Sequence, residues 1–294
     1  MNRCLFVPQS VFEVFAMQYQ IVADSSSNLF QLEDVPYACV PMKLITRENE
    51  YVDDPALDLE KTVSEIEKLT TPTGSSCPNS HEWLEAYGDA DAAFAVTITS
   101  NLSGACSAAR VAAETFAEQK PGAKVCVLDS LSTGPEMKLI VEKLRERILS
   151  GDLFEQIEQA VREYMKHTHL LFTLQSLNNL AKNGRVSPAV AKFANVLRIC
   201  IMGRASDEGT LEPLQKCRGE KRAMAALFEK MKEIGFKGGK VRIDHCLNLE
   251  GAQQLKDMIL SVFPSSDIII GECRALCSYY AERGGLLVGF EDGI

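Results

Sequence analysis

The stretch "VTITSNLSGACSAARVAAE" (residues 96–114) joins an apolar run to a helical pattern through a short polar turn. Residues 93–98 are apolar at nearly every position, which is typical of a buried parallel strand. From Ala105 onward, apolar residues follow helical spacing. The turn between them, residues 99–104, combines short hydroxyls with the free backbone N–H groups and positive dipole end of a helix N-terminus. This turn is therefore predicted to bind an anion.

The first half of the chain predicts a layered α/β domain. Three further strand-like runs accompany the one described above, at residues 20–26, 38–46 and 124–130. Helical patterns follow these runs or lie between them, at residues 60–69, 80–87, 104–118 and 134–149. Strands that alternate with helices predict parallel pairing. Three of the strands end in the hydroxyl-rich turns "DSSSN", "TSNLSG" and "DSLSTG". Because ligands of open α/β sheets bind outside the carboxyl ends of strands, we expect these turns to form one shared site.

The second half of the chain has a different order of elements and predicts an α+β domain with a mixed sheet. The expected strands are residues 169–175, 211–217, 240–246, 267–273 and 286–291, and the longer helices are 152–167, 219–234 and 250–262. The boundary is placed at Gly151, where "ILSGDL" interrupts a long helical stretch. The predicted domains are therefore residues 17–151 and 152–294. Residues 1–16 are interpreted as an upstream extension, since Met17 directly precedes the first strand.

Composition excludes several classes of protein. The 294 residues carry a net charge of −9, which argues against a nucleic-acid partner, because such surfaces need clustered Lys and Arg. No apolar run approaches the roughly 18–20 residues that span a bilayer. The ten cysteines are scattered without a C-x₂-C pair, which is typical of reduced thiols and favours a cytoplasmic protein.

The chain also lacks the usual catalytic and metal-binding motifs. It contains no P-loop, no G-x-G-x-x-G after a strand and no G-x-S-x-G elbow. Cys273 and Cys277 have no second cysteine pair, so a zinc site is the weaker interpretation. His167 and His169 are interpreted as a polar connection rather than a metal site. Ser103 could be a nucleophile, but nothing near it in sequence supplies a base.

Segments in order along the chain resemble motifs of the DegV family, the bacterial fatty-acid-binding proteins of the FakB type. "IVADSSSNL" looks like the family's opening strand and D-S-[ST] turn, and "VTITSNLSGACSAA" is similar to S-[SG]-x-L-S-G-T. "VLDSLSTG" resembles V-x-D-S-[KR]-x-[AVS], and residues 177–224 resemble L-x-x-L-x-K-G-G-R-[IV] followed by a basic segment. The resemblance runs from about residue 20 to about residue 290, and it implies a two-domain fold with a ligand tunnel between the domains.

The resemblance implies that the protein binds a long-chain fatty acid and presents its carboxylate to a separate fatty acid kinase, which forms the acyl phosphate. The anion predicted for the turn would then be a carboxylate, bound by Ser103 and Gly104. The family's T-S-Q-P-S motif aligns with "SSCPN" (residues 75–79), so Ser75 and Ser76 would add hydroxyls from a facing loop. No cofactor is expected beyond the bound fatty acid, and transient contact with a membrane surface is compatible with this role.

Two further groups of residues are assigned from the resemblance. For each candidate residue of the acyl-chain tunnel, an ordinary place in the core is the favoured alternative. The candidates are Phe172, Leu174, Val190, Phe193, Val196, Leu197 and Ile199. Basic residues stand out on this acidic chain. As an alternative to a solvated helix start, they are interpreted as residues that dock the kinase or neutralise phosphate charge. These residues are Arg185, Arg218, Lys221 and Arg222, with Lys216 beside them in sequence.

The family's G-[TC]-H-x-G-P-G segment differs in this chain, where it reads "GECRALC" (residues 271–277). Cys273 stands where the family has histidine, and it is assigned to the carboxylate site. The preferred interpretation is a non-catalytic carrier. Two alternatives stay open: a hydrolase or acyl-transfer enzyme that uses Ser103 or Cys273, and a DegV relative that binds another small amphiphile.

Overall fold

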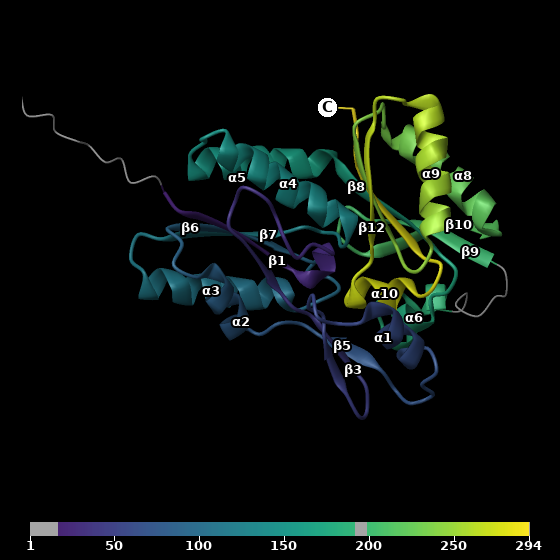
Figure 1. Cartoon of the computed structure of the whole chain (residues 1–294), viewed down its shortest axis with the longest axis horizontal. Coiled ribbons are helices and arrows are strands. Elements are labelled where there is room, and N and C mark those ends of the chain that lie inside the picture. The colour runs from purple at the N-terminus through teal and green to yellow at the C-terminus, as the bar shows by residue number, and fades with distance from the viewer. Residues whose placement is uncertain (1–16, 192–198, 294) are drawn as a thin grey trace, which may run out of the picture.

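The first of three sheets is the predicted parallel one. The computed structural model describes residues 17–191 and 199–293, and Figure 1 shows its arrangement. The sheet has the strand order β2-β1-β6-β7, and every neighbouring pair is parallel. Its strands are β1 (Tyr19–Asp24), β2 (Tyr37–Val40), β6 (Ala92–Thr97) and β7 (Lys124–Asp129). All six residues of β6 are buried, as its continuous apolar run predicted.

The second sheet is the predicted mixed one, with the strand order β10-β9-β8-β13-β11-β12. Only β11 and β12 pair in parallel, and the other neighbours are antiparallel. Its strands are β8 (Thr168–Leu174), β9 (Ile199–Ala205), β10 (Leu211–Arg218), β11 (Lys240–His245), β12 (Asp267–Glu272) and β13 (Leu286–Glu291). The expectation of a parallel domain followed by a mixed domain is confirmed, while the division at residue 151 stays a prediction.

A third, small antiparallel sheet was not predicted. It consists of β3 (Lys43–Ile45), β4 (Glu50–Val52) and β5 (Gly74–Ser76) in the order β4-β3-β5. The single strand expected at residues 38–46 is therefore wrong, because β2 ends before Pro41 and β3 belongs to the other sheet. Proline has no N–H to donate to a ladder, so the chain leaves the first sheet there.

Ten α-helices and two short 3₁₀ helices, Ser25–Ser27 and Met165–His167, are found in the residues that the structure describes. The α-helices are α1 (Leu59–Ile66), α2 (Ser80–Tyr87), α3 (Ala105–Gln119), α4 (Pro135–Leu149), α5 (Phe154–Tyr164), α6 (Asn178–Lys182), α7 (Pro188–Ala191), α8 (Glu220–Ile234), α9 (Leu249–Val262) and α10 (Ala275–Ala281). In Figure 1, α2 and α3 lie on one side of the parallel sheet, and α4 and α5 lie on the other. None of the helices in residues 17–191 and 199–293 has the length and apolar character needed to cross a membrane.

Helix α4 packs against both of the larger sheets. Its apolar side, which includes Met137 and Ile140, belongs to the core of the parallel sheet. Its first turn rests on Gly289 of β13, where a Cβ atom would lie 2.5 Å from the Glu136 nitrogen. A side chain at that position would push the helix away, so glycine sets the spacing between α4 and the second sheet.

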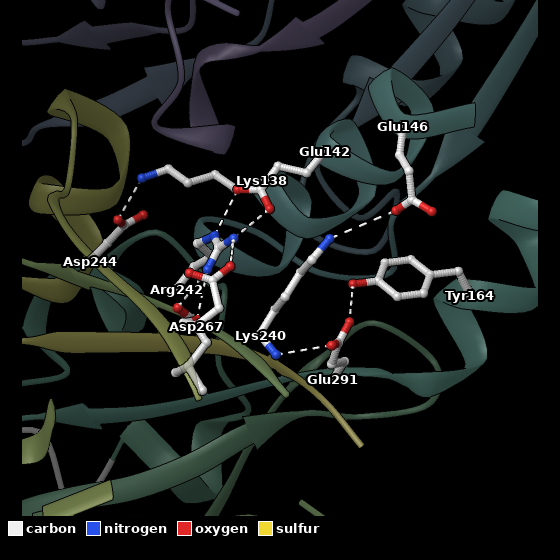
Figure 2. Close-up of polar contacts among 10 residues, drawn as sticks. Lys138, Glu142, Glu146, Tyr164, Lys240, Arg242, Asp244, Asp267 and Glu291 are labelled. Carbon is white, nitrogen blue, oxygen red and sulfur yellow. Dashed lines mark hydrogen bonds and ion pairs between the residues drawn. The ribbon is translucent and has the colours of Figure 1, made fainter. Parts of the chain in front are cut away.

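The side of α4 that faces the second sheet is polar, as Figure 2 shows. Lys138 Nζ lies 2.5 Å from Asp244 Oδ1, and both side chains are largely buried. Arg242 pairs with Glu142 on α4 at 2.7 Å and with Asp267 on β12 at 2.8 Å. Buried charges are tolerated only when they are paired and hydrogen-bonded. These ion pairs therefore fix the position of α4 relative to the second sheet.

We expect Asp244→Ala to lower the free energy of unfolding by about 3 kcal/mol, because it leaves the Lys138 ammonium buried without its carboxylate. Urea unfolding at pH 7 measures the loss. The matched control is Asp267→Ala, whose side chain is 56% exposed and whose removal leaves Arg242 paired with Glu142. That variant should lose less than about 1 kcal/mol. Equal losses in the two variants would contradict the role given to the buried pair.

Candidate functional site

A cavity of about 280 Å³ lies where the second sheet meets the β6–α3 turn, β5 and α10. Most of its wall is apolar. The second sheet contributes Leu170, Phe172 and Leu174 from β8, Leu211 from β10 and Leu287 from β13, and α6 adds Leu180. Residues 170, 172 and 174 share one face of β8 because side chains alternate along a strand. The cavity can therefore take an apolar chain.

One part of the wall carries hydroxyls and a helix N-terminus. Ser75, Ser76 and Cys77 come from β5 and the residue after it, and Ser103 and Gly104 come from the turn before α3. A Cβ atom on Gly104 would lie only 3.3 Å from Cys77 Sγ, so the two segments are in close contact. Gly104 is the N-cap residue of α3 and has no side chain to occupy the helix N–H groups. The structure thus brings together four of the five residues assigned to a carboxylate.

The fifth residue, Cys273, lies outside this wall. Its side chain is fully buried in an apolar cluster, and burial raises the pKa of the thiol well above its usual value. Cys277 borders the cavity instead, and its thiol donates to the Ser26 carbonyl oxygen at 3.3 Å. Helix α10 explains the difference, because residue 273 precedes the helix and residue 277 lies within its first turn. Residues 271–277 were interpreted as an altered motif, and this helix was not predicted from the sequence.

The idea of one site shared by three hydroxyl-rich turns is wrong for the first turn. Ser25, Ser26 and Ser27 are fully buried and take no part in the cavity wall. The Ser25 hydroxyl instead donates to Asp53 Oδ2 at 2.9 Å. The second turn supplies Ser103, and the third supplies Thr133. Short polar residues at strand ends can form hydrogen bonds within the protein or bind a ligand. The sequence pattern alone does not distinguish these two roles.

Of the residues assigned to the tunnel wall, Phe172 and Leu174 border the cavity. Val190 and Ile199 are partly buried and pack against the apolar cluster that contains these two. Phe193, Val196 and Leu197 lie outside the described residues.

The basic residues fall into two places. Arg185 borders the cavity, and its Nη1 donates to the Asn183 carbonyl oxygen at 2.5 Å. Arg218, Lys221 and Arg222 are exposed where β10 ends and α8 begins, and Lys216 is exposed on β10. Arg185 is therefore part of the cavity wall, whereas the other residues form a separate surface.

Four polar residues of the cavity wall were not predicted as site residues, namely Cys77, Thr133, Cys277 and Tyr280. The Tyr280 hydroxyl lies 2.8 Å from Ser75 Oγ. Residues 275–281 ("ALCSYYA") contain neither glycine nor proline, but the stretch is too short for helical periodicity to identify it.

The cavity wall offers no histidine from the described residues that could serve as the general base of a hydrolase. All four histidines fall among the residues that the structure describes, and none of them borders the cavity. The described residues also contain no group of three or more side chains placed to bind a metal ion.

Comparison with known proteins gives consistent matches along nearly the whole chain. A family model described as "Uncharacterised protein, DegV family" matches residues 18–291. A DegV domain-containing protein of Streptococcus pyogenes serotype M1 is 39% identical over 279 residues, which cover 94% of this chain and 100% of the relative.

Two solved structures resemble this one closely. A DegV family protein from Eubacterium eligens, loaded with heptadecanoic acid, is 41% identical with a TM-score of 0.91. The Streptococcus pneumoniae fatty acid kinase (Fak) B3 protein, loaded with linoleic acid, is 37% identical with a TM-score of 0.92. Each alignment covers 94% of this chain and 100% of the other.

Two buried carboxyl groups support the region around the cavity. Asp24, at the end of β1, accepts from the Ile98 nitrogen at 2.8 Å, and burial raises its pKa to about 6. Glu136, in the first turn of α4, accepts from the Thr168 hydroxyl at 2.9 Å, and burial raises its pKa from 4.5 to about 7. Between pH 4.5 and 7 the folded state therefore binds more protons at Glu136 than the unfolded state does, so stability falls as the pH rises.

We expect Glu136→Gln to reduce this pH dependence, because the amide does not ionise. Between pH 5 and pH 8 the wild-type protein should lose roughly 3 kcal/mol of unfolding free energy through this group, and the variant should keep it. Urea unfolding at the two pH values measures the difference. The exposed Glu118→Gln serves as control and should follow the wild type. A variant that parallels the wild type at both pH values would refute the assignment.

Proposed function

This chain belongs to the DegV family, and we propose that it binds a long-chain fatty acid in the cavity described above. The carboxylate lies at Ser75, Ser76, Ser103 and Gly104, and the hydrocarbon chain extends along Leu170, Phe172 and Leu174 of β8. The observation that carries this proposal is the form of the cavity wall, which is apolar over most of its area and has hydroxyls gathered with a helix N-terminus. The two similar structures loaded with fatty acids support the same ligand class.

The free energy of binding comes mainly from the hydrocarbon chain. Burial of ~14–16 methylenes at about 0.8 kcal/mol each amounts to roughly 11–13 kcal/mol before losses. The loss of translational and conformational freedom removes about 4 kcal/mol or more. The remainder suffices for tight binding, so the polar groups mainly orient the carboxylate and add a smaller share of the affinity.

We further propose that the protein presents the carboxylate to a fatty acid kinase. Hydroxyls and backbone N–H groups orient a carboxylate without a tight ion pair, so its oxygens stay available for reaction. The name of the similar Streptococcus pneumoniae protein, fatty acid kinase (Fak) B3, supports a kinase partner. Arg185 borders the same cavity and adds positive charge, which would favour both the carboxylate and a phosphate formed on it.

The exposed basic residues Arg218, Lys221 and Arg222 are our proposed docking surface for this kinase. On a chain with a net charge of −9, such a cluster would be attracted to an acidic patch on a partner. Within the described part of the chain, no carboxylate forms an ion pair with these three residues. Their charges therefore remain available to a partner.

A hydrolase that uses Cys273 or Ser103 is less well supported. Cys273 is buried and its thiol pKa is raised, so little thiolate forms near neutral pH. Ser103 lies in the cavity wall, to which no histidine contributes. A different amphiphile as ligand stays an outcome of the experiment below.

Organic extraction of the purified protein, followed by mass spectrometry, should release a long-chain fatty acid in near-equimolar amount. Tight burial of the chain should retain the ligand through purification. Recovery of a different lipid would instead favour another amphiphile. An empty protein that hydrolyses model esters would favour the hydrolase and contradict the carrier.

Simultaneous Arg218→Glu and Arg222→Glu should abolish acyl-phosphate formation by the kinase while fatty acid retention is unchanged. The reversed charges would repel an acidic partner surface but lie outside the cavity wall. A coupled kinase assay and extraction of the bound lipid measure the two properties. The control is Lys230→Glu with Lys232→Glu, the same charge change near the other end of α8. Kinase activity lost equally in both double variants would refute this docking surface.

A further inference from the structure

Two adjacent tyrosines of α10 contact adjacent parts of the segment that carries Ser75. The Tyr280 hydroxyl lies 2.8 Å from Ser75 Oγ, and the Tyr279 hydroxyl lies 2.7 Å from Thr73 Oγ1. Tyr280 and Ser75 border the acyl cavity. Tyr279 and Thr73 instead border a separate pocket of about 150 Å³. The chain thus contains two similar tyrosine–hydroxyl contacts, of which one faces the proposed ligand.

Helix α10 is firmly placed, so Tyr280 presents its hydroxyl from a fixed position. The Ala275 and Leu276 nitrogens donate to the two Asp53 oxygens at 2.9 and 3.1 Å. The Arg274 nitrogen donates to Asn28 Oδ1 at 2.8 Å. These bonds connect the start of α10 to the residues that follow β1 of the parallel sheet and β4 of the small sheet.

Either hydroxyl of this pair can donate, so a ligand beside Ser75 selects the direction. Burial raises the pKa of Tyr280, while the Ser75 hydrogen bond and the positive charge of Arg185 act in the opposite direction, and the phenol remains protonated near neutral pH. A serine hydroxyl has one proton to donate and can accept at its oxygen. An ionised carboxylate only accepts. When Tyr280 donates to Ser75 Oγ, the Ser75 proton is therefore free to point at the carboxylate.

We propose that Tyr280 is a positioning residue for the head group, which holds the Ser75 hydroxyl in the orientation that donates to the ligand carboxylate. This inference rests on the proposed function and deepens it, because it adds a residue of α10 to those that orient the acid. It also says how the carboxylate is oriented in a chain whose residues 271–277 differ from the family motif. The head group is oriented by a hydroxyl relay from within α10, and Cys273 makes no contribution.

The test compares Tyr280→Phe with the control Tyr279→Phe, which removes the neighbouring hydroxyl, bonded to Thr73 and Asn183, from outside the cavity. The probes are hexadecanoic acid and its methyl ester, bound to delipidated full-length protein. Tyr280→Phe should weaken binding of the acid about tenfold, since a hydrogen bond to a charged group loses its orientation, and should leave the ester unchanged. Tyr279→Phe should leave both unchanged. Equal loss of acid and ester in Tyr280→Phe would mean a merely structural role and would overturn the inference.

A second readout follows the carboxyl group itself. With hexadecanoic acid labelled with ¹³C at the carboxyl carbon, NMR titration should give a higher pKa for the acid bound to Tyr280→Phe than to Tyr279→Phe. Loss of a donor to the charged form raises a carboxyl pKa. Identical titrations would overturn the inference.

Two further variants complete the design. Ser75→Ala should lose affinity for the acid but not the ester, and adding Tyr280→Phe to it should cause no further loss, because the two hydroxyls act in series. Additive losses would overturn the relay.

Should Tyr280→Phe fail to fold, Ser75→Ala removes the same bond from the other side, and equal loss of acid and ester there would overturn the inference. A wild-type protein that binds no fatty acid would overturn the proposed function as well, whereas normal binding of the acid by Tyr280→Phe would overturn this inference alone.

Discussion

The buried carboxylate of Asp53 joins three parts of the molecule that are far apart in sequence. It follows β4 of the small sheet, accepts from the Ser25 hydroxyl after β1, and accepts from the Ala275 and Leu276 nitrogens at the start of α10. Burial of a carboxylate away from water is unfavourable in free energy unless hydrogen-bond donors surround it. Burial of Asp53 therefore requires these segments to contact one another. Once α10 is placed in this way, Cys277 and Tyr280 reach the cavity.

The apolar and polar parts of the cavity wall come from different parts of the fold. The second sheet supplies most of the apolar wall through one face of β8, while Leu171, on the opposite face, packs in the core under α8. The polar wall comes from the β6–α3 turn, β5 and α10, which belong to other layers. In the proposed complex, the hydrocarbon chain would therefore contact the second sheet and the carboxylate would contact the hydroxyls of the turns and β5.

Much of the fold could be predicted because its elements have strong local patterns. The apolar run of β6 and the helical spacing of α3 predicted a strand and a helix joined by a polar turn, and Ser103 and Gly104 of that turn border the cavity. Helix α2 begins where Asn79 and Glu82 form a capping box, so its start is encoded locally. The small sheet and α10 were missed, since three-residue strands and a seven-residue helix carry too little periodicity to be recognised.

The sequence by itself determined the types of the longer elements, the parallel and mixed sheets, and the turn residues Ser103 and Gly104, because periodicity and turn chemistry are local properties. Only the tertiary structure decided which of the many serines face the cavity and which are buried in hydrogen bonds. Ser25 and Ser103 both follow buried strands of the same sheet, yet Ser25 donates to Asp53 and Ser103 borders the cavity. The difference depends on residues more than 25 positions away in the sequence. A local sequence pattern cannot predict that such distant residues contact these turns.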